Sequence, residues 1–189
     1  MAEHLELWLV RHGETPASRD GVLAGWANVP LTPRGVAQAE AVRPMLEGEA
    51  FAGVWCSDLQ RAMDTAHLAY GAARPDPRLR EINFGELEGH AWAALDPDVR
   101  RSFAEFNGFH PAGGESLGQV RERVHGFLAG LPGGRHLIFT HGGVIRLLTR
   151  ECGHDAFVPT CTVVGLDWSR PELLFTRECP VAVPQSFTE

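Results

Sequence analysis

The stretch LELWLV (residues 5–10) runs directly into RHGET (residues 11–15), a change from apolar to polar residues that first indicates the fold. Six largely apolar residues are typical of a buried strand, although Glu6 lies among them. The run HLIFT (residues 136–140) has the same character and is followed by HGG (residues 141–143). We therefore predict two buried strands, each with polar residues at its carboxyl end.

Other segments alternate between helical and strand-like patterns. Thr32 is placed to cap a helix that begins at Pro33 and extends to Glu47, in which Pro44 favours a kink or an early end. Strands that alternate with helices favour a layered α/β fold with a mostly parallel sheet. The other expected elements are a strand at 53–57, helices at 58–70, 117–131 and 144–151, and a closing hairpin of strands at 162–168 and 172–176.

The length of 189 residues suits one sizeable core, so we expect a single domain over residues 1–189. Residues 81–115 have weaker regular patterning, and we expect them to form a lid that contributes to substrate choice. Residues 180–189 are expected to be a loose tail. The aromatic residues of the lid could stack on a substrate ring or could be ordinary core. These residues, and the histidine next to the last of them, are Phe84, Trp92, Phe103, Phe106, Phe109 and His110.

The charged residues narrow the class of ligand. All 17 basic residues are arginine, which excludes Schiff-base chemistry and a Walker-type phosphate lysine. A net charge of −7 argues against nucleic acid as the main partner. Arginine donates paired hydrogen bonds to phosphate oxygens and stays charged at any working pH, so any anion that the protein binds is expected to be held locally by arginine.

Several features predict a cytoplasmic protein. No apolar stretch approaches the roughly 20 residues that span a bilayer, so we expect no membrane partner. The first residues include Glu3 and Glu6 and lack the basic start of a secretory signal. The four cysteines show no CxxC spacing and are expected to be reduced thiols. We expect no metal, because His154 and Asp155 have no partner histidines at ligand spacing.

Polar residues gather after three of the expected strands. Arg11 and His12 follow the first, Arg61 lies one turn beyond the second, and His141 follows the third. The carboxyl ends of parallel strands share one edge of the sheet, where open α/β sheets bind their ligands. Gly142 then opens a helix whose N-terminal amides and dipole attract an anion. We predict that these residues form one anion-binding site.

Five short motifs follow one another along the chain. They are RHGET (11–15), PLTPRG (30–35), SDLQRA (57–62), LREI with FG and EG (79–89), and THGG (140–143). This ordered set resembles the motifs of the histidine phosphatase (phosphoglycerate-mutase-like) superfamily. An RHG tripeptide alone is weak evidence, whereas five motifs in order over positions 5–146 are specific. The resemblance implies a three-layer αβα sandwich with a mostly parallel central sheet.

The resemblance also implies a role for each residue. His12 would be the nucleophile, Arg11, Arg61 and His141 would hold the phosphoryl group, and Glu81 would donate a proton. A neutral imidazole can attack phosphorus and so split one difficult transfer into two easier ones. Cationic and hydrogen-bonding groups stabilise the charge that spreads over the equatorial oxygens, so neither a metal nor another cofactor is required. A carboxyl group can protonate the leaving alkoxide and then deprotonate water.

Plainer interpretations compete with these roles. Arg61 could be a surface arginine paired with Asp58 or Asp64 on its own helix. A histidine at a strand end is sometimes only structural. The proton donor could instead be Glu86 or Glu88, which lie close to the assigned position in the sequence.

The chain departs from the family pattern at two positions. Ser18 stands where relatives often have asparagine, and Ala24 stands where glutamine is common before Gly25. A serine hydroxyl can still donate a hydrogen bond to phosphate, but alanine cannot. Backbone amides at Gly25 or Gly142 can substitute for the missing side chain.

The short chain and the run GFHPAGGES (108–116) are similar to the compact phosphatase branch, which includes α-ribazole-5'-phosphate phosphatases. We predict a phosphoric monoester hydrolase of the histidine acid phosphatase type, with a phosphohistidine intermediate on His12. Its substrate would be a small phosphorylated metabolite, either α-ribazole 5'-phosphate or one of a broad range of phosphate esters. The main alternative is a cofactor-dependent phosphoglycerate mutase. A metal-dependent hydrolase and a non-catalytic binding module are less favoured.

Overall fold

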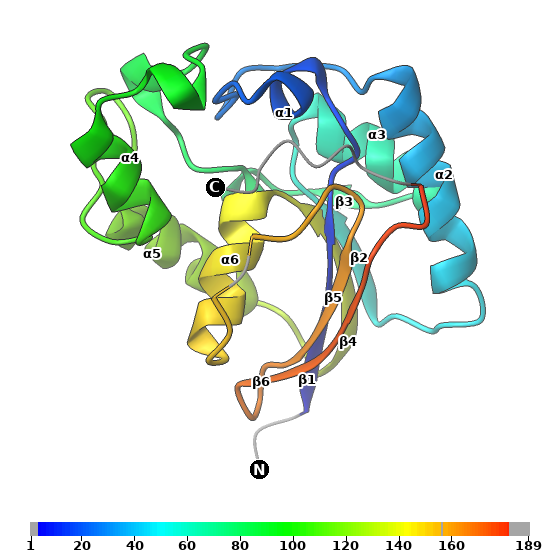
Figure 1. Ribbon diagram of the computed structural model, residues 1–189. Helices are drawn as coiled ribbons and strands as arrows, with labels where there is room; N and C mark the ends of the chain where they lie inside the picture. Colours follow the sequence, from blue (N-terminus) through cyan, green and yellow to red (C-terminus); the bar gives the residue numbers. More distant parts are fainter. Residues whose placement is uncertain (1–3, 156, 182–189) are drawn as a thin grey trace.

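The computed structural model describes residues 4–155 and 157–181, and within them the chain forms a six-stranded sheet of order β3-β2-β4-β1-β5-β6 (Figure 1). The first four strands of this order are parallel to their neighbours, whereas β5 is antiparallel to β1 and β6 is antiparallel to β5. The strands are β1 (Leu5–Arg11), β2 (Gly53–Cys56), β3 (Arg74–Pro75), β4 (Gly134–Thr140), β5 (Val163–Asp167) and β6 (Glu172–Arg177).

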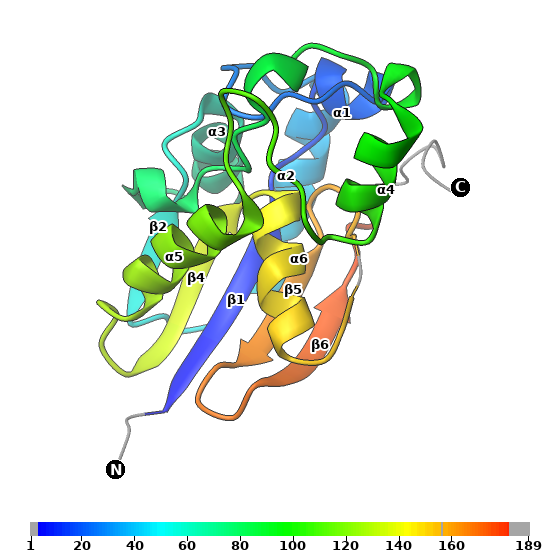
Figure 2. The same ribbon diagram turned by 90° about the vertical axis from the view of Figure 1, so that its left-hand side faces the viewer.

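Helices cover both faces of the sheet and complete three layers. Helices α2 (Pro33–Leu46) and α3 (Gln60–Ala69) lie on one face. Helices α5 (Leu117–Leu128) and α6 (Gly142–Glu151) lie on the other, which faces the viewer in Figure 2. The short helix α1 (Pro16–Asp20) lies beyond the carboxyl end of β1. The predicted αβα sandwich with a mostly parallel sheet is therefore confirmed.

Strand β1 is apolar along nearly its whole length because each of its two faces packs into a separate hydrophobic core. Leu7 and Leu9 belong to the core beneath α5 and α6, whereas Trp8 and Val10 belong to the core beneath α2 and α3. All four side chains are buried. Successive side chains of a strand point to opposite faces, so a strand covered on both sides carries no polar alternation.

Most predicted elements are confirmed, with small changes in their ends. The helix expected at 33–47 ends at Leu46, and Pro44 lies inside its last turn. An early end at Pro44 is wrong: the helix continues to Leu46, which is buried with Val42 in the core beneath α2. The predicted cap at Thr32 is present, since its side chain accepts from the Gly35 N–H. Ser116 likewise forms a capping box at the start of α5.

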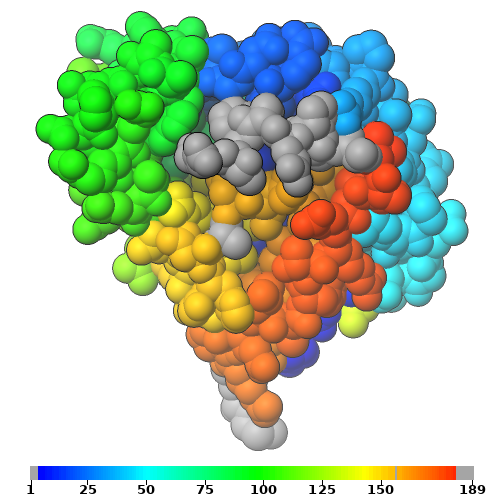
Figure 3. Space-filling model, in the orientation of Figure 1, coloured from blue at the N-terminus to red at the C-terminus, as the bar shows by residue number. Residues whose placement is uncertain are grey.

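The sequence patterns did not predict the short elements α1 and α4 (Pro97–Ala104). Helix α4 and the 3₁₀ turns η2 (Gly85–Leu87) and η3 (Trp92–Ala94) belong to the segment 81–115. Figure 3 shows this segment in green beside the blue N-terminal segment. Backbone hydrogen bonds from Trp92 N to Gly21 O and from Leu23 N to His90 O join the two. The expected lid segment thus lies against residues 21–23, while its contribution to substrate choice stays a prediction.

The structure also bears on the predictions for the cysteines, for membrane-spanning helices and for the C-terminal tail. All four cysteines are free thiols. Over residues 4–155 and 157–181, no helix has the length and apolar character that crossing a membrane requires. The expected tail at 180–189 lies, apart from its first two residues, outside the described part of the chain.

Two glycines let the N-terminus of α2 pack directly against the loop that follows β1. A Cβ atom at Gly13 would lie 2.5 Å from the Gly35 carbonyl oxygen, and a Cβ atom at Gly35 would lie still closer to the Glu14 carbonyl oxygen. Both separations are well below van der Waals contact. The close approach aligns α2 with the backbone on either side of Gly13, next to His12.

We expect Gly35→Ala to lower the free energy of unfolding by at least about 2 kcal/mol, because backbone on both sides prevents the methyl group from being accommodated. The same shift should displace residues 13–14 and reduce activity. Urea unfolding and steady-state kinetics measure the two effects. Gly126→Ala in α5 is the matched control, since a Cβ atom there meets nothing within 4 Å. That change should stabilise the protein by about 0.5–1 kcal/mol. Equal stability of the two variants would contradict the packing argument.

Candidate active site

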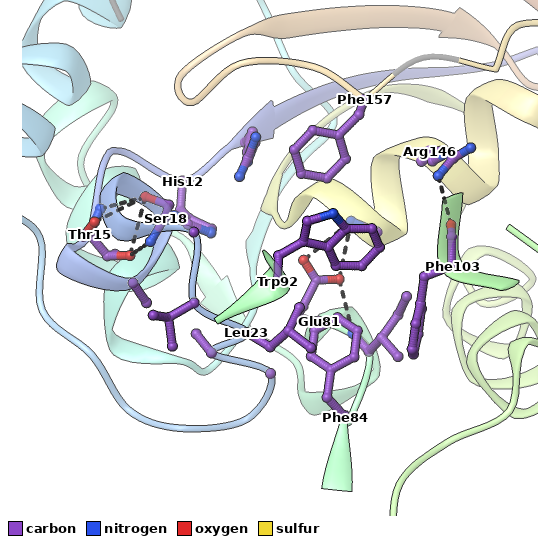
Figure 4. A pocket seen from close by; sticks show the side chains of 18 of the residues that line it. His12, Thr15, Ser18, Leu23, Glu81, Phe84, Trp92, Phe103, Arg146 and Phe157 are labelled. Carbon is purple, nitrogen blue, oxygen red and sulfur yellow. Dashed lines mark hydrogen bonds between the residues drawn. The ribbon is translucent and has the colours of Figure 1, made fainter. Parts of the chain in front are cut away.

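A cavity of about 420 Å³ opens beyond the carboxyl end of β1 (Figure 4). Its walls come from four parts of the chain: the residues after β1, the loop at 21–25, the segment 81–115, and the start of α6 with the loop that follows it. The polar side chains that line it are Arg11, His12, Thr15, Ser18, Arg61, Glu81 and Arg146. Its apolar walls are Ala17, Val22, Leu23, Ala24, Ile82, Phe84, Trp92, Phe103, Ala104, Phe106 and Phe157.

His12 lies at the end of β1, where its backbone N–H donates to the Thr140 carbonyl of β4. Its Nδ1 atom is 2.8 Å from the Gly13 carbonyl oxygen, which can only accept a hydrogen bond. The proton is therefore on Nδ1, and Nε2 carries the lone pair. Burial, and then the charges of Arg61 and Arg11, lower the pKa of His12 well below its ordinary value. The ring is neutral at neutral pH, as a nucleophile requires.

Arg11 and Arg61 each bring a guanidinium group to the cavity, and Arg61 is buried whereas Arg11 is half-buried. Arg11 donates from Nη1 to the Val158 carbonyl over 2.6 Å, and Arg61 donates from Nη1 and Nη2 to the carbonyls of Ala27 and Gly25. Burial lowers the pKa of Arg11 to about 10, so it stays charged at neutral pH. Burial likewise lowers the pKa of Arg61. In the part of the chain that the structure describes, the Nε atoms of both arginines are buried without a hydrogen-bond partner.

His141 lies next to His12 and is fully buried. The centres of the two rings are 5.2 Å apart. Its Nε2 atom is 2.8 Å from Ser57 Oγ, while its Nδ1 atom is buried and has no hydrogen-bond partner within residues 4–155 and 157–181. Burial, and then the charge of Arg61, lower the pKa of His141 well below its ordinary value. His141 is thus neutral and keeps one ring nitrogen free.

Three of the predicted site residues have a buried nitrogen without a partner in the described ranges: Nε of Arg11, Nε of Arg61 and Nδ1 of His141. Arg11 and Arg61 line the cavity, whereas His141 is fully buried beside His12 and is not part of the lining. Leaving a buried polar group without a partner costs roughly 1–3 kcal/mol each. A bound anion with several acceptor oxygens would relieve that cost.

Glu81 reaches the cavity from the segment that follows the 3₁₀ turn η1 (Pro77–Leu79). Its carboxylate accepts from the Ile82 N–H over 2.9 Å and from the Gly143 N–H over 3.1 Å, at the N-terminus of α6. The backbone carbonyl of Glu81 accepts from Arg123 Nη2 and Trp26 Nε1. Both ends of the residue are therefore held in place.

The structure bears on two alternatives: Glu86 or Glu88 as the proton donor, and Arg61 as a surface arginine paired with an acidic residue. Neither Glu86 nor Glu88 lines the cavity; Glu86 is exposed, and Glu88 accepts from the backbone N–H groups of Trp26 and Phe84. The suggested pairing of Arg61 with acidic residues of its own region is wrong. Asp58 pairs instead with Arg80, through two hydrogen bonds of 2.6 and 2.7 Å, and Asp64 accepts from Gln60.

The other predicted phosphate ligands have a mixed outcome. Ser18 lines the cavity, but its hydroxyl is bonded to the backbone of Thr15 in the capping box of α1. Ala24 also lines the cavity and offers no donor from its side chain. Gly142 opens α6 as predicted, although the carboxylate of Glu81 already occupies the amide of the next residue, Gly143. The N-terminus of α6 therefore holds the carboxylate of the proposed proton donor.

Several residues that organise the site were not found from the sequence. Arg123 donates to the carbonyls of Arg78, Arg80 and Glu81 and pairs with Glu115, so it fixes the segment that presents Glu81. Arg146 lines the far end of the cavity. The hydrogen-bond partners of Arg123 are backbone carbonyls 42–45 positions away in sequence, and no local pattern marks such contacts.

No group of three or more His, Cys, Asp and Glu side chains that could hold a metal ion occurs among the residues described. The acidic residue Asp155 is instead paired with Arg146 and Arg150. Whether the reaction proceeds without a metal stays a prediction.

Comparison with known proteins identifies the family. The family model of the histidine phosphatase superfamily (branch 1) matches residues 7–160. The chain is 36% identical over 156 residues to the adenosylcobalamin/alpha-ribazole phosphatase of Escherichia coli (strain K12), covering 76% of this chain and 77% of that protein. It is 30% identical over 190 residues to the probable phosphoglycerate mutase GpmB of Cronobacter sakazakii (strain ATCC BAA-894), covering 94% and 83%.

The solved structures agree with the sequence relatives. The crystal structure of TTHB049 from Thermus thermophilus matches with a TM-score of 0.85 and 47% identity, over 90% of this chain and 98% of that one. Phosphatases and mutases both occur among the relatives, and both transfer phosphoryl groups. The chain therefore belongs to the histidine phosphatase superfamily (branch 1) and is a phosphoryl-transfer enzyme.

Proposed function

We propose that the protein is a phosphomonoesterase that hydrolyses a small phosphorylated metabolite through a phosphohistidine on His12. One observation carries the proposal. A neutral imidazole with a free Nε2 lines the same cavity as two arginines and lies beside a second histidine, and each of these three residues has a buried nitrogen without a partner in the described ranges. The same cavity contains the carboxylate of Glu81.

In the first half of the reaction, Nε2 of His12 attacks phosphorus and the P–O bond to the leaving group breaks. Arg11, Arg61 and His141 donate to the phosphoryl oxygens, whose negative charge is spread over three atoms in the transition state. Hydrogen bonds with other residues hold these three side chains before the substrate arrives, so little reorganisation is needed during the reaction. Glu81 enters this half-reaction as the carboxylic acid and gives its proton to the leaving oxygen.

In the second half, a water molecule attacks the phosphohistidine. Glu81, now without its proton, accepts one from that water, and inorganic phosphate forms as the P–N bond breaks. His12 returns to its neutral form, with the proton on Nδ1. The hydrogen bonds that hold Glu81 at both ends suit it to act in both half-reactions.

The walls of the cavity favour a ring-bearing leaving group. Phe84, Trp92 and Phe157 line it, and Figure 4 shows Trp92 and Phe157 between His12 on one side and Phe103 on the other. Phe157 is 56% exposed and has the Arg11 guanidinium over its ring, 4.4 Å from the centroid, so a ligand could contact only the part of the ring away from Arg11. Flat rings gain from offset or edge contacts with aromatic side chains. We therefore favour α-ribazole 5'-phosphate, which carries a heteroaromatic base, over small aliphatic esters.

The charges in the cavity argue against the main alternative, a phosphoglycerate mutase. A phosphoglycerate carries a carboxylate in addition to its phosphate, and a bisphosphoglycerate carries a second phosphate as well. Apart from Arg11 and Arg61, the arginine in the cavity wall is Arg146. Its guanidinium is paired with Asp155 over 2.6 Å and donates to the carbonyls of Phe103 and Ala104. Among the residues that the structure describes, a second anionic group would thus meet no uncommitted cation in the cavity wall.

The test is a comparison of two activities in one preparation. Release of phosphate from α-ribazole 5'-phosphate should proceed with a kcat/KM at least about 100-fold higher than from 3-phosphoglycerate, because ring contacts and charge mismatch both contribute to discrimination. Interconversion of phosphoglycerates, assayed with 2,3-bisphosphoglycerate, should be slower still. A mutase rate that exceeds phosphate release from every ester tested would contradict the proposal. Undiminished turnover in a chelator would agree with a reaction that needs no metal.

A further inference from the structure

Gln38 lies on α2, outside the cavity, and is fully buried. Its Oε1 atom accepts from the backbone N–H of Glu14 over 2.9 Å and from the hydroxyl of Thr160 over 3.0 Å. A backbone N–H can only donate, so the amide oxygen and not the nitrogen must face Glu14. The Nε2 atom is buried with no hydrogen-bond partner in the described ranges.

The unpaired nitrogen bears on the role of the residue. Burying a donor without a partner destabilises a protein, and in this amide the oxygen accepts two hydrogen bonds while the nitrogen donates none to the described residues. A side chain serving packing alone would avoid that cost by being apolar. The oxygen is therefore the informative part of Gln38, and its main contact is the peptide group next to His12.

One peptide group links Gln38 to His12. The N–H of Glu14 and the carbonyl of Gly13 belong to the same planar unit, and that carbonyl accepts from Nδ1 of His12 over 2.8 Å. Gln38 thus bonds to one side of the peptide while His12 bonds to the other. A hydrogen bond to the N–H of an amide polarises it and strengthens its carbonyl as an acceptor.

We propose that Gln38 is a positioning residue for the nucleophile, an inference that rests on the proposed function. It fixes the peptide between residues 13 and 14 so that the Gly13 carbonyl keeps the proton of His12 on Nδ1 and leaves Nε2 free. When Nε2 bonds to phosphorus, the imidazole becomes positively charged and its Nδ1–H bond becomes charge-assisted. The effect of Gln38 therefore grows in the transition state and lowers the barrier of the chemical step.

The variant Gln38→Met tests this inference, because methionine has a similar volume but no comparable acceptor. We expect kcat to fall roughly 5- to 10-fold while KM changes less than about twofold, as for an interaction strengthened in the transition state. We also expect the ¹⁵N spectrum of His12 in the free enzyme to show a population protonated on Nε2. Thr160→Val removes only the outer hydrogen bond and should give a smaller effect in the same direction.

Val42→Ala is the matched control. Val42 lies one turn further along α2 and is fully buried, and its truncation should lower the melting temperature without changing kcat or the tautomer of His12. An unchanged kcat and tautomer in both Gln38→Met and Thr160→Val would overturn the inference, and the Thr160 variant alone decides if the other does not fold. Failure of the proposed function has a different signature, since the wild type would then form no phosphohistidine even if Gln38→Met shifts the tautomer.

Discussion

His12→Ala should lower the rate of phosphate release by at least about 10⁴-fold, because the variant has no nucleophile to form the covalent intermediate. The neighbouring arginines and His141 would still bind the phosphate, so KM should change far less than kcat. Steady-state phosphate release, measured with the wild type and the variant at equal concentration, gives both parameters.

His67→Ala is the control for the histidine substitution, because His67 is exposed on α3 and lies outside the cavity. It should retain full activity. The His12 variant must also keep a cooperative unfolding transition, since the side chain it loses is buried. A folded His12→Ala protein with a rate within about tenfold of the wild type would show that water or another side chain attacks the substrate.

Glu81→Gln should separate the substrates by their leaving groups. Phosphorylation of the enzyme by an alkyl ester should slow by about 10²–10⁴-fold, because an alkoxide must be protonated as it leaves. Phosphorylation by 4-nitrophenyl phosphate should be affected much less, because nitrophenolate leaves without a proton. The first turnover, followed by rapid mixing, isolates this step from the later attack by water, which the variant should also slow.

Glu86→Gln and Glu88→Gln are the matched controls for Glu81. Both carboxylates lie outside the cavity lining and should leave the leaving-group dependence unchanged. Unaltered alkyl-ester rates in Glu81→Gln, with a loss in one of the other two variants, would transfer the donor role to that residue.

Much of the fold follows from local patterns in the sequence. The runs at 5–10 and 136–140 are buried on both faces, so nearly continuous apolar residues identify them as central strands, and β1 and β4 are indeed neighbours. The location of the candidate site could also be predicted from the sequence, since the carboxyl ends of parallel strands lie at one edge of the sheet. Arg11 and His12, together with His141, meet there although 129 positions separate His12 from His141.

The remaining features depend on contacts that no local pattern records. Helix α1 is a single capped turn, and α4 forms within a segment with weak periodicity, so tertiary packing decides both. The aromatic residues of that segment divide between two roles. Phe84 and Trp92 line the cavity while partly exposed, whereas Phe109 is buried and stacks on Phe103.

The position of Glu81 in the candidate site likewise depends on a contact that no local sequence pattern records. The sequence assigned the N-terminus of α6 to a phosphate, because free amides at a helix start attract anions. The structure places the carboxylate of Glu81 on the amide of the next residue, Gly143, while phosphate binding by Gly142 stays a prediction. Charge and spacing predicted that an anion would bind there, but only the folded chain shows that its own carboxylate does so.

Rapid quenching of the wild-type enzyme with a radiolabelled phosphate ester, followed by peptide mapping, tests the nucleophile most directly. We predict an acid-labile, alkali-stable label on the peptide that contains His12, formed at least as fast as the steady-state turnover. Turnover without any covalent label, or a label on a different residue, would contradict the mechanism.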